Sequence, residues 1–156
     1  MEESDSQACP ASRTVSGTAP ECTVIAIWHD IDHNGGANVH EWFVPEGTLT
    51  FDRRTFIGRD QIAEVYRARR DGTNRVARHV ATNLQVEGID DATVKVVSTL
   101  VLFAGNGDPP LREVVPQLVA DVQDVFVRTR DCWLIQARRI SHVFISEDTV
   151  LGVPTS

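Results

Sequence analysis

The chain has 156 residues, of which 42% are hydrophobic and 24% are charged, a composition typical of one folded domain with a core of its own. Its formal net charge of −7 disfavours nucleic acid or an anionic membrane surface as a partner. No run in the sequence approaches the roughly eighteen apolar residues that a membrane span requires.

The two ends of the chain differ in composition from its middle. Residues 1–20 are acidic and rich in serine and threonine, without the apolar stretch of a signal peptide, so we expect a disordered lead-in there. The ordered domain is expected over residues 21–145, followed by an irregular tail over residues 146–156. The three cysteines show no metal-binding spacing, so we expect free thiols in a reducing compartment and a cytoplasmic protein.

The first half of the ordered part is expected to be mainly helical. Apolar residues recur at helical spacing after Pro20, and Asn34-Gly35-Gly36 is typical of a left-handed helix end. Pro45-Glu46-Gly47 predicts a turn into a strand. The expected helices are Glu21–Asp32, Ala37–Phe43 and Asp60–Arg70, and the expected short strands are Thr48–Asp52 and Thr55–Gly58.

In the second half of the ordered part, apolar and polar residues alternate with a period of two, as is typical of long strands separated by turns. The expected strands are Arg75–Glu87, Thr93–Phe103, Val119–Arg128 and Trp133–Phe144. Helices followed by strands predict an α+β fold, in which three N-terminal helices pack on one face of a strongly curved, mainly antiparallel sheet.

A histidine stands out in the first long strand. His79 lies among small and polar residues of one parity, such as Asn83, while Val80 and other β-branched residues occupy the opposite parity. This pattern fits a strand that buries its β-branched face and lines a cavity with the face of His79. An ordinary half-exposed strand with a surface histidine fits it too.

Asp32 is the best candidate partner for His79. It follows Trp28 by four residues, so on a helix it lies at the end of the buried stripe, where a carboxylate needs a partner. An aspartate fixes the tautomer of an imidazole and stabilises the imidazolium formed after proton abstraction. Without a nucleophilic serine or cysteine beside it, such a pair predicts elimination, hydration or isomerisation. A structural histidine with a helix-end carboxylate is the alternative.

Other polar groups receive structural interpretations. His29, Asp30 and His33 surround Asp32 in sequence but point around a helix, so no metal site is expected. Of the neighbours Arg138 and Arg139, only one can face inward, where it could pair with an acidic neighbour or bind a substrate oxyanion; a surface ion pair is the favoured role of either. Asp124 remains ambiguous, and the arginines at positions 67, 69 and 70 are expected to form a solvated helix end. No nucleotide-, flavin- or nicotinamide-binding motif is present, so no cofactor is expected.

Four features follow one another along residues 21–145. They are Trp28 with Asp32, FVPEGTLTF (43–51) with the Gly-Arg-Asp helix start at 58–60, RHVATN (78–83), and DVFVRTRDCWLIQARRI (124–140). In this order and spacing they resemble the SnoaL-like branch of the nuclear transport factor 2-like superfamily.

The resemblance implies a cone-shaped α+β roll with a deep, mostly apolar pocket between sheet and helices. The family includes polyketide cyclases, dehydratases, noncatalytic members and β subunits of ring-hydroxylating dioxygenases. In its dehydratase-type members, an aspartate on the first helix pairs with a histidine on the first long strand, and Asp32 and His79 match these positions. Trp28 stands where those enzymes often have a tyrosine, and an indole cannot act as a general acid.

We therefore expect a cofactor-independent lyase or isomerase that acts on a small apolar molecule, cyclic or polyketide-like. His79 would be the general base and Asp32 would orient it. The expected substrate-binding residues are Trp28, Asn83, Phe51 and Tyr66. By resemblance, a homodimer through the outer sheet face is expected. The alternative is a noncatalytic protein that binds a small molecule or supports a partner subunit.

Overall fold

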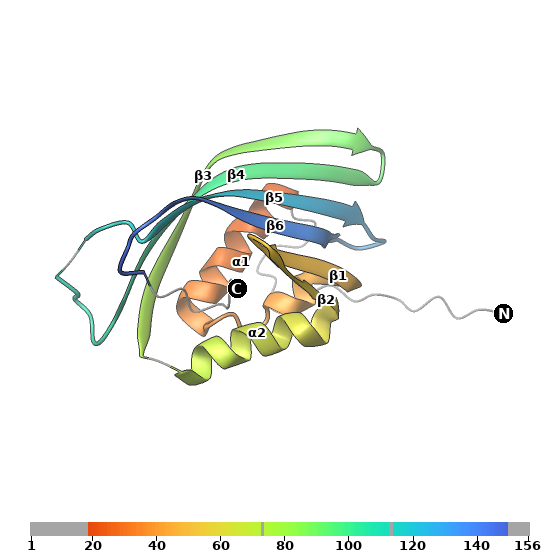
Figure 1. Cartoon of the computed structure of the whole chain (residues 1–156). Coiled ribbons are helices and arrows are strands. Elements are labelled where there is room, and N and C mark those ends of the chain that lie inside the picture. Colours follow the sequence, from red (N-terminus) through yellow and green to blue (C-terminus); the bar gives the residue numbers. More distant parts are fainter. Residues whose placement is uncertain (1–18, 73, 113, 150–156) are drawn as a thin grey trace.

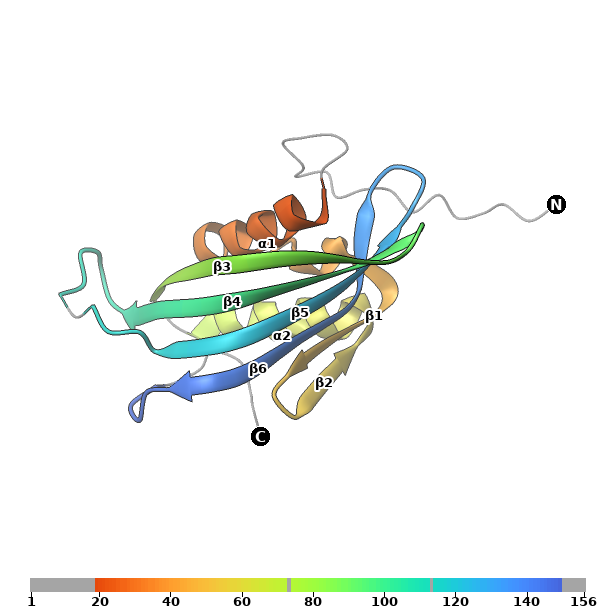
Figure 2. The same ribbon diagram turned by 90° about the horizontal axis from the view of Figure 1, so that it is seen from above.

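The computed structural model of the chain describes residues 19–72, 74–112 and 114–149 (Figure 1). A curved sheet covers the helices, which all lie on its concave side (Figures 1 and 2). The elements are α1 (Pro20–Asn34), the 3₁₀ helix η1 (Val39–Trp42), β1 (Phe43–Phe51), β2 (Arg54–Ile57), α2 (Gly58–Gly72), β3 (Arg75–Asp90), β4 (Thr93–Asn106), β5 (Leu118–Arg128) and β6 (Trp133–Ile145). The predicted α+β fold with a curved, mainly antiparallel sheet is confirmed.

The prediction of three N-terminal helices is wrong. The segment Ala37–Phe43 forms only the four-residue 3₁₀ helix η1, and strand β1 begins at Phe43, five positions before the predicted start at Thr48. Phe43 pairs with Ile135 of β6, and the register then shifts before Thr48 pairs with Ala137. The turn signal Pro45-Glu46-Gly47 therefore marks an irregularity inside a strand rather than the start of one.

The strand order in the sheet is β2-β1-β6-β5-β4-β3. The β1–β6 pair is parallel and the other neighbours are antiparallel. Burial along β5 alternates, so that Ala120, Val122, Asp124 and Phe126 face the helices. In the order of the sheet, β3 is an edge strand, and α1 packs against it.

One face of β3 differs from expectation, because its β-branched side is exposed upstream of Asn83 rather than buried. His79 and the small residues beside it face α1, whereas Val80 on the opposite parity is 47% exposed. At Asn83 the backbone adopts a φ of 52°, and the register with β4 shifts between Thr82 and Gln85. Beyond this bulge the parity changes, and Leu84 packs against the core. The β-branched residues of β3 therefore reflect strand propensity at an edge rather than burial.

The chain leaves α1 through a tightly bonded turn. Gly35 takes the left-handed conformation, with a φ of 61°, as the helix-end motif predicts. The Asp30 carboxylate accepts hydrogen bonds from the Asn34 side chain at 3.0 Å and from the Asn38 backbone N–H at 3.0 Å. Gly36 follows with a φ of 73° and lies against the ring of Tyr66 on α2. This turn fixes how the end of α1 meets α2.

Replacing Gly36 with alanine should lower the free energy of unfolding by about 2–4 kcal/mol, because a left-handed alanine is strained and the packed site cannot expand freely. The new Cβ would lie 2.5 Å from Cδ1 of the Tyr66 ring. Gly72→Ala is the matched control, since a Cβ there meets nothing within 4 Å. Urea unfolding with a constant m-value measures the difference; equal stability of the two variants would contradict the role assigned to this turn.

Several predictions fall partly or wholly outside the described residues. The disordered lead-in (1–20) and the irregular tail (146–156) do so for the most part.

Among the cysteines, Cys22 is free and exposed, but Cys132 is disulfide-bonded, so the expectation of three free thiols is wrong. No helix in the described ranges is long and apolar enough to cross a membrane.

Candidate functional site

Asp32 and His79 form a bidentate pair. The Asp32 carboxylate accepts a hydrogen bond from the His79 backbone N–H at 2.8 Å, and its other oxygen lies 2.5 Å from His79 Nδ1. The two side chains are 6% and 5% exposed. Because Asp32 occupies Nδ1, Nε2 remains as the ring nitrogen for a second partner. The structure thus brings the two predicted residues together, 47 positions apart in sequence.

The local structure explains why they meet. Asp32 lies one helical turn after Trp28 on the face of α1 that packs against β3, at the end of the buried stripe of Val24, Ile27 and Ile31. His79 lies on the inner face of β3, upstream of the bulge at Asn83. An inserted residue in β3 before His79 would turn its ring to solvent, because side chains alternate between the two faces of a strand.

Trp28 joins the pair to a second polar group. Its indole stacks on the His79 ring, with centroids 4.8 Å apart and an angle of 11° between the planes. The guanidinium carbon of Arg138 lies over the same indole, 4.8 Å from its centroid. Such contacts favour a cation on the aromatic face, which can be Arg138 or a protonated His79.

Arg138 is held by a buried ion pair. Its Nε and Nη2 donate to the two carboxylate oxygens of Asp124, at 2.6 and 2.9 Å, and the side chains are 0% and 1% exposed. The two residues pair directly across strands β5 and β6. The surface ion pair expected for Arg138 is therefore wrong.

The electrostatic surroundings keep His79 neutral at neutral pH. The pKa of His79 lies below its ordinary value, chiefly because burial disfavours the charged imidazolium. Its bond to Asp32 acts in the opposite direction, and the positive charges of Arg69 and Arg75 lower the pKa further. A neutral imidazole is the form that a general base requires.

Three buried hydrogen-bond donors in this region lack partners among the described residues. They are Trp28 Nε1, Arg138 Nη1 and the Ser98 hydroxyl. Ser98 lies on the inner face of β4, two residues from Val96, which pairs with Asp124. A buried donor without an acceptor is costly, so these groups suit an acceptor oxygen supplied by a ligand or by water.

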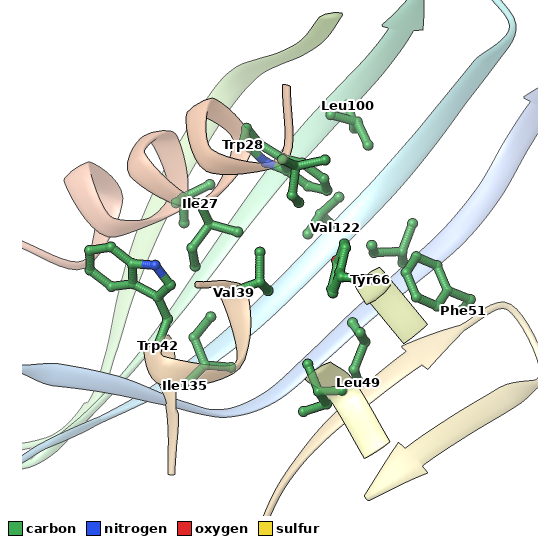
Figure 3. Close-up of a cluster of buried hydrophobic side chains, with 14 of the residues drawn as sticks. Ile27, Trp28, Val39, Trp42, Leu49, Phe51, Tyr66, Leu100, Val122 and Ile135 are labelled. Carbon is green, nitrogen blue, oxygen red and sulfur yellow. The ribbon is translucent and has the colours of Figure 1, made fainter. Parts of the chain in front are cut away.

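The remaining predicted residues lie in different places. Tyr66 of α2 is buried in the core on the side of Phe51, and burial raises the pKa of its hydroxyl, so that it stays a hydrogen-bond donor (Figure 3). Its hydroxyl interacts electrostatically with Arg138. Phe51 contacts Phe56 edge-on, with the ring centroids 6.4 Å apart. Asn83 is exposed in its bulge and is not brought to the dyad.

A pocket of about 300 Å³ has Asp32 in its wall. It lies between the C-terminal ends of α1 and α2 and the start of β3, and Arg69, Arg70 and Arg75 also line it. Arg69 is half-buried and attracted by the Asp32 carboxylate. The prediction of a solvated helix end therefore fails for Arg69. The sequence contains a feature that could have indicated this position: Arg69 follows Tyr66 by three residues, and residues three apart share a helix face.

The model of the SnoaL-like domain family matches residues 25–139 of the chain. No curated protein sequence matches it. Among solved structures, a candidate scytalone dehydratase from Novosphingobium aromaticivorans has a TM-score of 0.71 and 15% identity, over 85% of this chain and 87% of the other.

Two further structures have similar folds. ActVI-ORFA from Streptomyces coelicolor has a TM-score of 0.66 and 18% identity, over 80% of this chain and 98% of the other. The β subunit of a candidate aromatic-ring-hydroxylating dioxygenase from N. aromaticivorans has a TM-score of 0.72 and 15% identity, over 86% of this chain and 93% of the other. At these identities the likeness shows the fold alone.

Proposed function

The chain belongs to the SnoaL-like domain family of the nuclear transport factor 2-like superfamily, and we propose that it is a cofactor-independent lyase or isomerase of the dehydratase or cyclase type. The observation that carries this proposal is the buried Asp32–His79 pair, with its second ring nitrogen left for a substrate. The substrate is a small, largely apolar, cyclic or polyketide-like molecule that carries a carbonyl group.

In the proposed reaction, His79 Nε2 removes a proton from the carbon next to the carbonyl. The electron pair of the broken C–H bond forms the enolate, whose negative charge rests on the carbonyl oxygen. The imidazolium formed is stabilised by the Asp32 carboxylate and by the face of the Trp28 indole. The proton then returns to another carbon in isomerisation, or to a hydroxyl group that leaves as water in dehydration.

In this proposal, the donors for the developing oxyanion come from Trp28 itself and from Arg138, whose guanidinium contacts the same indole as His79. Arg138 Nη1 and Trp28 Nε1 are buried donors without described partners, and the Asp124 pair holds the guanidinium in place. Preorganised donors of this kind favour the charged transition state over the neutral ketone. Burial of Arg138 and Trp28 strengthens the effect, because little water competes for the oxyanion.

Exchange of the α-hydrogens of 2-tetralone in D₂O, followed by ¹H NMR, tests the proposal without assuming a leaving group. 2-Tetralone is a bicyclic ketone, and exchange needs only the proposed base and a site for the oxygen. We expect the full chain to accelerate exchange over buffer, in proportion to protein concentration. A noncatalytic binding protein or a subunit that supports a partner, the alternative that the fold likeness to a dioxygenase β subunit suggests, would bind such a ketone without accelerating exchange.

A further inference from the structure

The pocket at the ends of α1 and α2 has a charge opposite to that of the protein. The chain carries a net charge of −7, but three arginines line this pocket, and Asp32 is the acidic residue in its wall. Both carboxylate oxygens of Asp32 already accept hydrogen bonds from His79. The charge of the side chains that line the pocket is therefore mainly positive.

Arg69 is the residue that distinguishes this pocket from an ordinary helix end. Arg70 donates to the Gly35 carbonyl at 3.2 Å, as a basic residue near a helix C-terminus commonly does. Arg69 instead is half-buried between Asp32 and Tyr66 and forms no hydrogen bond within the described ranges. A guanidinium that is partly removed from water and lacks a hydrogen-bonded partner gains from an oxyanion.

The charges around Arg69 support the same conclusion. Burial lowers the pKa of Arg69, and burial together with the charge of Arg69 lowers that of Arg75, so two guanidinium groups repel each other across the pocket. An anion between them relieves this repulsion. Ile31 adds an apolar surface to the wall, and about 300 Å³ is the lower end of the size range of small-molecule sites.

We infer that this pocket is an anion-binding site that takes the carboxylate of a small organic acid through Arg69. The planar guanidinium matches a carboxylate in a bidentate manner. Asp32 belongs both to the wall of this pocket and to the proposed dyad, and on that link we assign the acid as the substrate, a cyclic ketone that bears one carboxylate. Naming it the substrate rests on the function proposed above, whereas the anion site itself does not.

Calorimetric titration of the full chain with benzoate tests the site, in a buffer free of phosphate. We expect saturable binding of benzoate and much weaker binding of its neutral isostere benzamide. Arg69→Gln should raise the Kd for benzoate roughly tenfold or more, the usual effect of losing one charge-assisted hydrogen bond. Arg67→Gln is the matched control, because it removes the same charge from an exposed side chain of the same helix. Its Kd should stay close to that of the wild type.

Each other outcome overturns the inference. Absence of saturable benzoate binding, equal binding of benzamide, or the same Kd for Arg67→Gln and Arg69→Gln would show that no specific carboxylate site exists. Inorganic phosphate bound in preference to benzoate would replace the carboxylate with a different ligand class. Benzoate binding is measured without turnover, so a failure of the proposed catalysis leaves this result unaffected.

Discussion

Replacing His79 with glutamine should lower the protein-dependent exchange rate of 2-tetralone by about 10²–10⁴-fold, the usual contribution of a positioned general base. Glutamine is close to histidine in size, and its side-chain amide can still donate a hydrogen bond to Asp32, which lies 2.5 Å from the ring in the wild type. The amide cannot accept a proton at neutral pH. The variant therefore removes the base and keeps its surroundings.

The pH dependence separates the base from its positioning residue. Because the pKa of His79 is lowered from its ordinary value of 6.5, the wild-type rate should be constant near pH 7 and fall on acidification below pH 6.5, as the imidazole takes up a proton. Asp32→Asn removes the carboxylate that raises the pKa of His79, so the midpoint of this fall should move to lower pH, together with a loss of rate. An unchanged midpoint in Asp32→Asn would show that the titration of His79 does not control the rate, and would contradict its role as the base.

His29→Gln is the control for the same chemical change on an exposed residue. His29 lies on α1 and contacts His33 rather than the dyad. Its exchange rate should equal that of the wild type, and circular dichroism of all variants verifies that they are folded. If His79→Gln retained the wild-type rate while folded, the dyad would be a structural clamp between α1 and β3.

The part of the site that could be predicted depends on short-range geometry. The four-residue spacing from Trp28 placed Asp32 on the buried face of a helix, where a carboxylate needs a partner. His79 was the histidine on a strand face that could line a cavity, so Asp32 had few alternative partners. The helix and strand ranges followed from periodicity and from glycine- and proline-containing turns, because these signals are local in the chain.

Features that depend on irregular backbone or on long-range register could not be predicted in this way. Asn83 shares the parity of His79 in sequence, but the bulge turns it to solvent, and a bulge leaves no strong signal in one sequence. The 3₁₀ helix η1 has the apolar spacing of an α-helix but is too short to become one. The pairing of Asp124 with Arg138 required the register of β5 with β6.

Replacing Asp124 with asparagine should lower the free energy of unfolding by about 3–5 kcal/mol, because it leaves the charge of Arg138 buried without its counterion. Both carboxylate oxygens of Asp124 accept from Arg138, and the guanidinium is 0% exposed. Water cannot replace the lost partner without opening the core between β5 and β6. Urea unfolding at constant m-value measures this change.

The exposed ion pair on α2 is the control for the same kind of contact in water. Arg67 lies 2.5 Å from Glu64, but the side chains are 57% and 59% exposed. Arg67→Met should leave the stability nearly unchanged, because solvent screens the pair. If Asp124→Asn were equally mild, Arg138 would have to be solvated in the folded protein, and the burial on which its proposed role rests would be wrong.

The double variant Asp124→Leu with Arg138→Met shows why a buried ion pair is present at this position. Removing both charges together leaves none uncompensated, so the double variant should be far more stable than Asp124→Asn and comparable to the wild type. Arg138 Nη1 is a buried donor without a described partner, and the guanidinium carbon lies over the indole that stacks on His79. The double variant should therefore be folded but exchange 2-tetralone slowly. Wild-type exchange by a stable double variant would assign the pair to folding specificity and remove Arg138 from the proposed reaction.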